Sequence, residues 1–256
     1  MSEHIQVRDA GGVREITFAR PEKKNALSTA MYRSAREALE DAQVSPDVRV
    51  VLFAGEGEAF TAGNDLADFA KAAAGEASEP EAHRFIEALA VAQKPIIAAV
   101  PGLAVGVGMT MLLHCDLVYV ADTAKLSAPF INLGLSPEAA SSLLLPARIG
   151  HVRAFAAFAL GEAISGVEAV SLGLANRMTS RDDVLETARA AARTLAGKPL
   201  GSVIATKRLM RDAAALARQI EAESHVFAER LTSEEAREAF RAFAERRPPN
   251  FVHLKP

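Results

Sequence analysis

Short apolar runs alternate with helical segments along most of the chain, and this alternation limits the possible folds more than any other feature. The predicted strands lie at residues 48–54, 96–100, 117–121 and 175–179, and the helical segments lie at residues 28–42, about 65–93 and about 106–113. Nearly continuous apolar strands that alternate with helices are typical of parallel sheets covered by helices. The sequence therefore predicts an α/β fold.

Both ends of the chain depart from this alternation. Residues 5–7 and 15–19 flank Asp9-Ala-Gly-Gly, a pattern that predicts a β-hairpin. The last part of the chain is mostly helical, and Thr232-Ser-Glu-Glu235 predicts the cap of its final helix. We expect an α/β core at residues 1–195 and a helical C-terminal region at residues 196–256.

Two serines indicate further helix starts between these regions. Ser136 precedes Pro137, and serine is a good N-cap while proline is tolerated in the first turn. Ser165 precedes Glu168 by three residues, which is the spacing of a capping box. A helix is therefore expected after each serine.

Charge and cysteine content exclude several classes of partner and site. The net charge of −3, from 29 basic and 32 acidic residues, provides no broad positive field for nucleic acid. Cys115 is the only cysteine, so no intramolecular disulfide and no thiolate metal cluster can form. With no secretory signal at the start, a reducing, cytoplasmic location is expected.

An apolar stretch at residues 96–113 has the length of a candidate membrane span. Pro101 and three glycines, at 102, 106 and 108, interrupt it, and a polar segment follows at once. A buried strand, a tight loop and a helix explain the stretch better, so no membrane association is expected.

Two turns could present backbone N–H groups to a ligand. Gly63 and Asn64 follow a strand and precede a helical segment, where free N–H groups are aimed outward; an ordinary turn with Asp65 as N-cap is the alternative. Gly102-Leu-Ala-Val-Gly-Val-Gly108 is the second turn and could offer the N–H of Val107, although close strand–helix packing would also explain its glycines. It lacks the third glycine of a dinucleotide fingerprint.

The two turns together resemble the crotonase (enoyl-CoA hydratase/isomerase) superfamily. The resemblance is carried by Arg20-Pro-Glu-Lys-Lys-Asn-Ala-Leu-Ser28, Ala-Gly-Asn-Asp-Leu66, residues 102–116, residues 129–149 and the stretch near Phe240. It implies a spiral of ββα units with a helical C-terminal region that covers the active site or joins subunits, an acyl-CoA thioester substrate and a homotrimer or hexamer. It also implies an oxyanion hole formed by the N–H groups of Asn64 and Val107.

The resemblance also identifies Glu138 as the acid–base group. Hydratases of this superfamily use two glutamates, whose positions are occupied here by Thr110 and Phe130. Neither side chain can serve as a carboxylate base. The sequence Leu135-Ser-Pro-Glu-Ala139 resembles the peroxisomal-type Δ3,Δ2-enoyl-CoA isomerase branch, in which one glutamate moves the proton. A single carboxylate is enough for this isomerisation, because it can take a proton from C2 and return it at C4.

Glu138 also has a purely structural explanation. An acidic residue in the first turn of a helix is favoured by the helix dipole anywhere. The dipole would lower its pKa, whereas burial beside apolar side chains would raise it. Both effects remain open at the level of the sequence.

The resemblance assigns further residues to the substrate and coenzyme A site. These are Lys24, Ala26, Leu27, Ala62, Gly63, Asp65, Leu66 and Phe130. No cofactor is expected beyond the coenzyme A of the substrate. No metal is expected, because none of the six histidines shows ligand spacing.

Other functions remain to be weighed against the isomerase. A hydratase-like lyase or a hydrolase would need water positioned by another group, such as Asp65 or Glu76. A noncatalytic acyl-CoA-binding protein could keep the fold after losing both usual glutamates. A nicotinamide-dependent enzyme is disfavoured by the missing glycine fingerprint.

Overall fold

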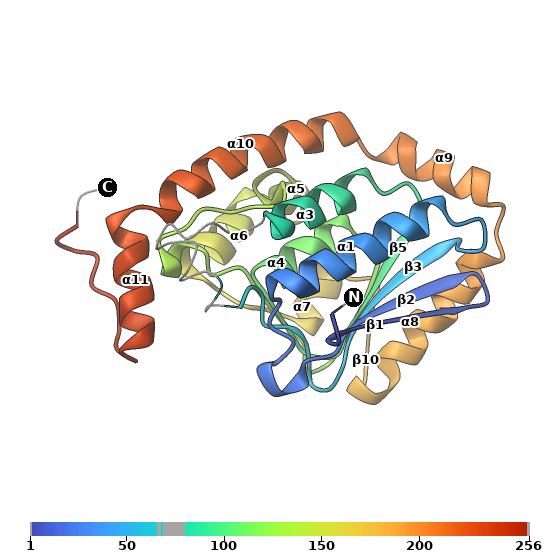
Figure 1. Ribbon diagram of the computed structural model, residues 1–256, viewed down its shortest axis with the longest axis horizontal. Coiled ribbons are helices and arrows are strands. Elements are labelled where there is room, and N and C mark those ends of the chain that lie inside the picture. Colours follow the sequence, from blue (N-terminus) through green and yellow to red (C-terminus); the bar gives the residue numbers. More distant parts are fainter. Residues whose placement is uncertain (1, 66–67, 69–79, 255–256) are drawn as a thin grey trace.

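The computed structural model describes residues 2–65, 68 and 80–254 (Figure 1). Its strands are β1 (Ile5–Ala10), β2 (Val13–Phe18), β3 (Val50–Gly55), β4 (Ala59–Thr61), β5 (Ile96–Val100), β6 (Leu103–Val105), β7 (Leu117–Ala121), β8 (Lys125–Ser127), β9 (Ile164–Ser165) and β10 (Arg177–Thr179). Its α-helices are α1 (Thr29–Val44), α3 (Glu81–Val91), α4 (Val107–Thr110), α5 (Ser141–Ile149), α6 (His151–Phe155), α7 (Gly166–Ser171), α8 (Arg181–Ala196), α9 (Leu200–Met210), α10 (Ala213–Leu231) and α11 (Glu234–Ala244).

Two sheets organise these elements. The larger sheet has the strand order β1-β2-β3-β5-β7-β10, in which β1 and β2 form the predicted antiparallel hairpin and all other neighbours are parallel. The smaller sheet has the order β4-β6-β8-β9. Each of β3, β5 and β7 is followed by a short strand of the smaller sheet and then by helical structure. The predicted α/β class and the spiral of ββα units are confirmed.

The larger sheet is buried on both faces, because alternate side chains of its strands meet different helices. In β3, Val50 and Leu52 belong to the apolar cluster that includes Ala188 and Ala192 of α8. The alternate residues Val51 and Phe53 belong to the main core, which also contains the buried side chains of α1 and α3. The alanine face of α8 lets that helix approach β3, β5 and β7 closely. This explains why the central strands are apolar without interruption.

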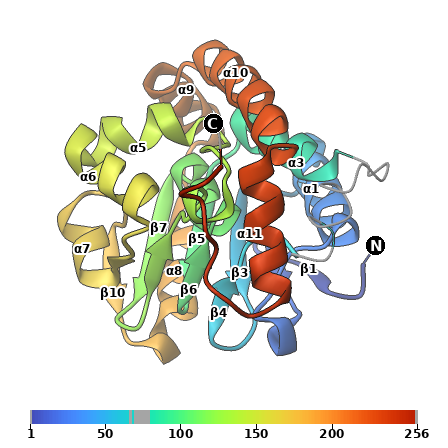
Figure 2. The ribbon, with the colours of Figure 1, turned by 90° about the vertical axis from the view of Figure 1, so that its left-hand side faces the viewer.

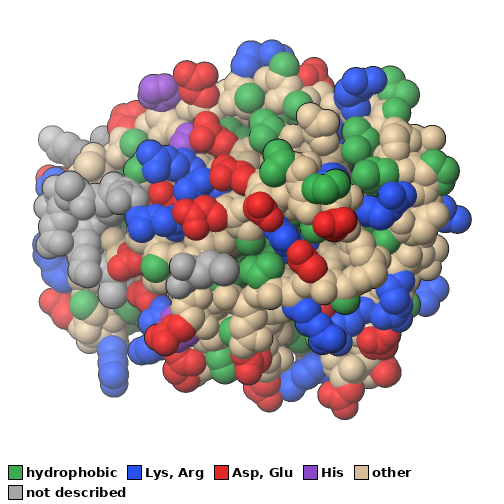
Figure 3. All heavy atoms as spheres, turned by 45° about the vertical axis from the view of Figure 1, so that its right-hand side comes forward, with side chains coloured by type: hydrophobic (Ala, Val, Ile, Leu, Met, Phe, Trp, Pro, Cys, Tyr) green, Lys and Arg blue, Asp and Glu red, His purple; other side chains and the backbone are tan. Residues whose placement is uncertain are grey.

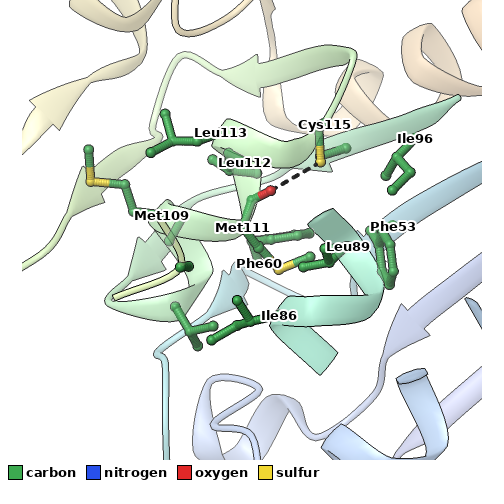
Figure 4. Close-up of a cluster of buried hydrophobic side chains, with 14 of the residues drawn as sticks. Phe53, Phe60, Ile86, Leu89, Ile96, Met109, Met111, Leu112, Leu113 and Cys115 are labelled. Atoms are coloured by element: carbon green, nitrogen blue, oxygen red, sulfur yellow. Dashed lines mark hydrogen bonds between the residues drawn. The ribbon is translucent and has the colours of Figure 1, made fainter. Parts of the chain in front are cut away.

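The main core lies between the two sheets and the helices α1 and α3. Figure 4 shows its aromatic, aliphatic and sulfur side chains packed together, with Phe53 and Phe60 among them. Cys115 belongs to this core, where its Sγ donates to the carbonyl of Met111 at 3.5 Å. Burial raises the pKa of the Cys115 thiol to about 12. The cysteine is therefore a neutral packing residue at physiological pH.

Two glycines allow the chain to cross from the larger sheet to the smaller one. A Cβ atom at Gly55 would lie 2.3 Å from the carbonyl oxygen of Ala59, and one at Gly102 would lie 2.0 Å from that of Glu58. Any side chain at these corners would collide with backbone. The corners place β4 and β6 side by side, and the turns that follow these two strands form the site described below.

Three further predictions can be compared with the structure. The strands at residues 96–100 and 117–121 are confirmed residue for residue, and the Ser165–Glu168 capping box is present. The predicted helix at about 106–113 is divided into α4 and a 3-10 turn, Met111–His114. Within the helical segment predicted at about 65–93, α3 (Glu81–Val91) is helical, and residues 66–67 and 69–79 lie outside the described residues.

The helix predicted to begin at Ser136 is wrong. Helix α5 begins at Ser141, after Ala139 and Ala140, which have φ values of 63° and 54°. Two consecutive left-handed residues cannot continue a right-handed helix. The Ser136 hydroxyl is buried and has no hydrogen-bond partner among the described residues, so it caps nothing there.

The C-terminal helices wrap around the core. Helix α10 lies along α3 (Figures 1 and 2). Helix α11 packs against the 3-10 turn Ile131–Leu133. Ser233 caps α11 through the backbone N–H of Ala236, as the sequence predicts for this segment. The proposed boundary near residue 195 stays a prediction.

The surface carries mixed charge. Figure 3 shows basic and acidic side chains interleaved over the face in view, with scattered apolar groups between them. Among the described helices, none is both long enough and apolar enough to cross a membrane.

We predict that Gly102→Ala destabilises the protein by about 1–3 kcal/mol, because the new methyl group meets the Glu58 carbonyl oxygen. The matched control is Gly201→Ala, at a site in α9 with no atom within 4 Å of the added carbon. The control should be neutral or stabilising by up to about 1 kcal/mol. Urea unfolding measures both changes, and equal stability of the two variants would contradict this account of the corner.

Candidate active site

A cavity of about 380 Å³ lies under α10, next to α1 and α3. Its lining comprises Leu27, Thr29, Tyr32, Asn64, Asp65, Asp68, Pro80, Ala82, His83, Ile86, Glu138, Ala139, Ile220, Ser224, Phe227, Ala228 and Leu231. The wall surface is mainly apolar, and polar side chains from several elements contribute to it. This combination is typical of small-molecule sites.

The two predicted glycine turns lie against each other beside this cavity. Strands β4 and β6 are parallel neighbours, with Ala59 opposite Leu103, so the turns that follow them emerge at the same edge of the smaller sheet. Gly63 has a φ of 88°, and a Cβ atom there would lie 2.7 Å from the carbonyl oxygen of Val105. Glycine is needed for this close approach.

The N–H groups of Asn64 and Val107 have no hydrogen-bond acceptor among the described residues. The backbone on either side of Asn64 is hydrogen-bonded to Leu27. The Asp65 N–H donates to the Leu27 carbonyl at 2.9 Å, and the Leu27 N–H donates to the Gly63 carbonyl at 2.8 Å. Val107 is the first residue of α4, so its N–H has no partner within the helix. Asn64 lines the cavity and Val107 does not, so the oxyanion hole formed by their two N–H groups stays a prediction.

Tyr32 fixes the side chain of Asn64. Its hydroxyl donates to the Asn64 Oδ1 at 2.5 Å, and Tyr32 lines the cavity from α1. Burial raises the pKa of Tyr32, and the nearby Glu138 charge raises it further. Tyr32 therefore remains a neutral donor across physiological pH. The sequence analysis did not identify it.

Glu138 reaches the cavity from the segment that precedes α5. Its Oε1 accepts a hydrogen bond from the Thr110 hydroxyl at 2.6 Å. Burial raises the pKa of Glu138 to about 7; the Thr110 hydrogen bond opposes this rise and the charge of Glu223 adds to it. The net shift of the Glu138 pKa is upward because burial outweighs the Thr110 hydrogen bond.

The turn that carries Glu138 is held from several sides. His114 Nε2 donates to the carbonyl of Ala139 at 2.7 Å, and Arg211 donates to the other ring nitrogen. Burial lowers the pKa of His114 to about 3, and the charge of Arg211 contributes, so the ring is neutral. These contacts stabilise the left-handed conformations of Ala139 and Ala140, which cost about 1–2 kcal/mol each. Glu138 is thus not in the first turn of a helix, contrary to the structural explanation considered above.

The residues predicted to contact substrate are only partly brought together. Leu27, Asn64 and Asp65 line the cavity, and Asp65 is paired with Arg20 at 2.7 Å. Lys24, Ala26, Ala62 and Gly63 lie in two segments that pair beside it, through the Ala62 N–H and the Lys24 carbonyl at 2.9 Å. Leu66 lies outside the described residues.

Phe130 lies apart from the cavity lining. Its side chain is buried in the main core, with its ring centroid 6.3 Å from that of Phe158. Phe130 therefore fills space in the core, and substrate contact by this residue stays a prediction.

Sequence reasoning missed the groups supplied by α3 and α10. His83 and Ser224 line the cavity and are hydrogen-bonded at 3.1 Å between Ser224 Oγ and His83 Nδ1. Glu223 is a buried carboxylate close to Glu138. Within the described ranges, no group of three or more histidine, cysteine or acidic side chains is arranged to hold a metal ion.

Comparisons with known proteins are consistent with this geometry. The chain matches the family described as enoyl-CoA hydratase/isomerase over residues 8–253. A probable enoyl-CoA hydratase of Mycobacterium leprae is 32% identical over 93% of both chains. Enoyl-CoA delta isomerase 2 of Rattus norvegicus is 34% identical over 96% of this chain and 65% of its own length.

A solved structure extends the likeness to the fold. The enoyl-CoA hydratase/isomerase of Pseudoalteromonas atlantica T6c superposes with a TM-score of 0.92 at 39% identity, covering 98% of this chain and 100% of its own. On the sequence match and the shared fold together, this chain belongs to the enoyl-CoA hydratase/isomerase family of the crotonase superfamily.

Proposed function

We propose that this protein is an enoyl-CoA isomerase that moves the double bond of a 3-enoyl-CoA to the 2-position. The observation that carries this proposal is the environment of Glu138, a cavity-lining carboxylate whose pKa is raised to about 7. Such a group can both accept and release a proton near neutral pH.

The reaction requires only this group and two backbone donors. The Glu138 carboxylate removes a proton from C2, and the electron pair moves into the thioester carbonyl to give a dienolate. The N–H groups of Asn64 and Val107 stabilise the negative oxygen, and the loss of one such donor typically costs about 3–4 kcal/mol. The dienolate then takes the proton back from Glu138 at C4, which leaves the double bond between C2 and C3.

The other described carboxylates of the cavity are less suited to this role. The Asp65 carboxylate is occupied by an ion pair with Arg20 at 2.7 Å. Asp68 accepts from the backbone N–H of Thr29 at 3.0 Å and from its hydroxyl at 3.2 Å. Glu138 accepts only the Thr110 hydroxyl among the described donors, so one of its oxygens remains available to the substrate.

The cavity walls suit an apolar acyl chain. Ile86 of α3 and Ile220, Phe227 and Leu231 of α10 form an apolar surface next to Glu138. We propose that the acyl chain lies along this surface while the coenzyme A moiety passes the segment that contains Lys24 and Ala26. A homotrimer or hexamer, implied by the resemblance, stays a prediction.

Hydratase activity is the main alternative, and several relatives carry hydratase names. Two carboxylates that position one water are the usual requirement for it, and this chain has Thr110 and Phe130 at the corresponding places. Thr110 instead donates to Glu138, so that position now supports the remaining carboxylate. Water positioning by Glu76 falls outside the described residues. Binding without turnover across a panel of acyl-CoA thioesters would favour a noncatalytic protein.

We predict that Glu138→Gln lowers kcat for conversion of a 3-enoyl-CoA to a 2-enoyl-CoA by about 10²- to 10⁴-fold, because the amide cannot accept the C2 proton. The control is Glu162→Gln, which removes the same charge at an exposed site and should leave kcat unchanged. Chromatography of the products measures how much 2-enoyl-CoA each variant forms from the 3-enoyl-CoA. Full activity of the Glu138 variant, or formation of only a 3-hydroxyacyl product from a 2-enoyl-CoA, would refute the proposal.

The pH dependence gives a second prediction. Only the ionised form of Glu138 can remove the C2 proton, so kcat/KM should rise with pH through about 7 and level off above it. Thr110→Val removes the donor that favours the ionised form, which should move this rise to higher pH. Thr206→Val, at an exposed site of α9, is the matched control. A shift to lower pH in the Thr110 variant would contradict the assignment.

A further inference from the structure

Helix α10 carries a charged residue in its apolar stripe. Leu216, Ile220, Phe227 and Leu231 follow helical spacing on the face that meets the core and the cavity, and Glu223 lies on the same face. Its exposed fraction is only 6%. A buried carboxylate is costly unless hydrogen bonds compensate it, so its position calls for a specific partner.

That partner is the first turn of α5. Glu223 Oε1 accepts from the backbone N–H of Ser142 at 2.9 Å and from its hydroxyl at 2.5 Å. Gln219, one turn earlier in α10, donates to the same Ser142 hydroxyl at 2.9 Å. The N-cap residue of α5 is Ala140, which has no side-chain acceptor. Glu223 therefore supplies from another helix the cap that α5 lacks.

We propose that Glu223 is a positioning residue for the reaction. By capping α5, it holds the turn that carries Glu138. Its negative charge also opposes the positive end of the α5 dipole beside Glu138. This inference rests on the proposed role of Glu138 as the proton carrier. It assigns a task in catalysis to the C-terminal region, because α10 provides the charge that faces the turn.

Glu138 lies close enough to the start of α5 to be affected by the dipole of that helix. Its backbone carbonyl accepts from the N–H of Ser141, the first residue of α5, at 3.1 Å. The positive end of a helix favours a nearby carboxylate in its ionised form and so lowers its pKa. Glu223 acts in the opposite direction on the pKa of Glu138. Burial raises the pKa of Glu223 itself, and the hydrogen bonds from Ser142 counter this rise.

The other titratable groups around Glu138 come from three elements. Tyr32 faces it from α1, Asp65 and Asp68 line the cavity after β4, and His83 lines it from α3. Asp65 is paired with Arg20, and His83 Nε2 lies 3.3 Å from Glu87. Among the described residues, Glu223 is the charged group whose field acts directly on Glu138.

A purely structural cap would act differently from a charged one. The amide oxygen of Glu223→Gln can still accept from Ser142, so the variant retains a cap but loses the charge. If the role were only structural, the substitution would change the size of kcat/KM but not the pH at which kcat/KM rises. The charge role requires this pH to change.

We predict that in Glu223→Gln the rise of kcat/KM with pH occurs about 1 pH unit lower than in the wild type. The reason is that the pKa of Glu138 falls when the like charge is removed. For a pKa that falls from about 7 to about 6, the ionised fraction at pH 6 rises from about 9% to about 50%, roughly fivefold. Glu223→Asp keeps the charge, so its kcat/KM should rise at a pH near that of the wild type. Glu221→Gln, on the exposed face of α10, is the matched control and should not move this rise.

A titration that does not depend on turnover separates this inference from the proposed function. The carboxyl ¹³C resonance of Glu138, assigned by its loss in Glu138→Gln, reports its pKa directly in each variant. A downward shift in Glu223→Gln shows that the charge of Glu223 acts on Glu138 whether or not Glu138 carries the proton. Activity of Glu138→Gln would refute the proposed function, and with it a catalytic role for Glu223, but not this electrostatic link. An unmoved Glu138 titration in folded Glu223→Gln would overturn it. If the glutamine variant fails to fold, Glu223→Met, which removes both the charge and the cap, replaces it, and an unmoved Glu138 titration in that variant would equally overturn the inference.

Discussion

A buried carboxylate needs either a compensating partner or a proton, and the region around Glu138 follows from that constraint. Glu138 has one hydrogen-bond donor, Thr110, and lies beside a second buried carboxylate, Glu223. The proton therefore leaves it near neutral pH, which neither an exposed glutamate nor one paired with arginine would do. Asp65 at the same cavity is instead paired with Arg20.

The conformation that keeps Glu138 in this environment is maintained by distant parts of the chain. Ala139 and Ala140 are left-handed, and His114 and Glu223 bind this turn and the start of α5 from the 3-10 turn after α4 and from α10. The carboxylate thus depends on the core and on the C-terminal helices together. The positions of the Asn64 and Val107 N–H groups depend instead on the pairing of β4 with β6, which is possible because Gly55 and Gly102 permit the sharp corners before these strands.

The sequence predicts the parts of the fold that local pattern determines. The apolar runs of β5 and β7 and the capping box at Ser165 are found where expected. The three-residue strands β4, β6 and β8 carry too little periodicity to be recognised within glycine-bearing turns. The Ser136-Pro137 signal failed because tertiary contacts hold Ala139 and Ala140 in conformations that the local sequence does not favour. Glu223 could have been noticed as a charge in an apolar stripe, but its partner Ser142 is 81 residues away.

Membership of the family leaves the reaction open, because hydratases and an isomerase are among the relatives. The proposed isomerisation requires one carboxylate to reach both C2 and C4 of the substrate. A crystal structure of Glu138→Gln with bound 3-enoyl-CoA tests this most directly. We expect the thioester oxygen within about 3 Å of the Asn64 and Val107 N–H groups, with the residue 138 side chain facing both C2 and C4. Acyl carbons that instead face another ionisable side chain, with residue 138 turned away from them, would contradict it.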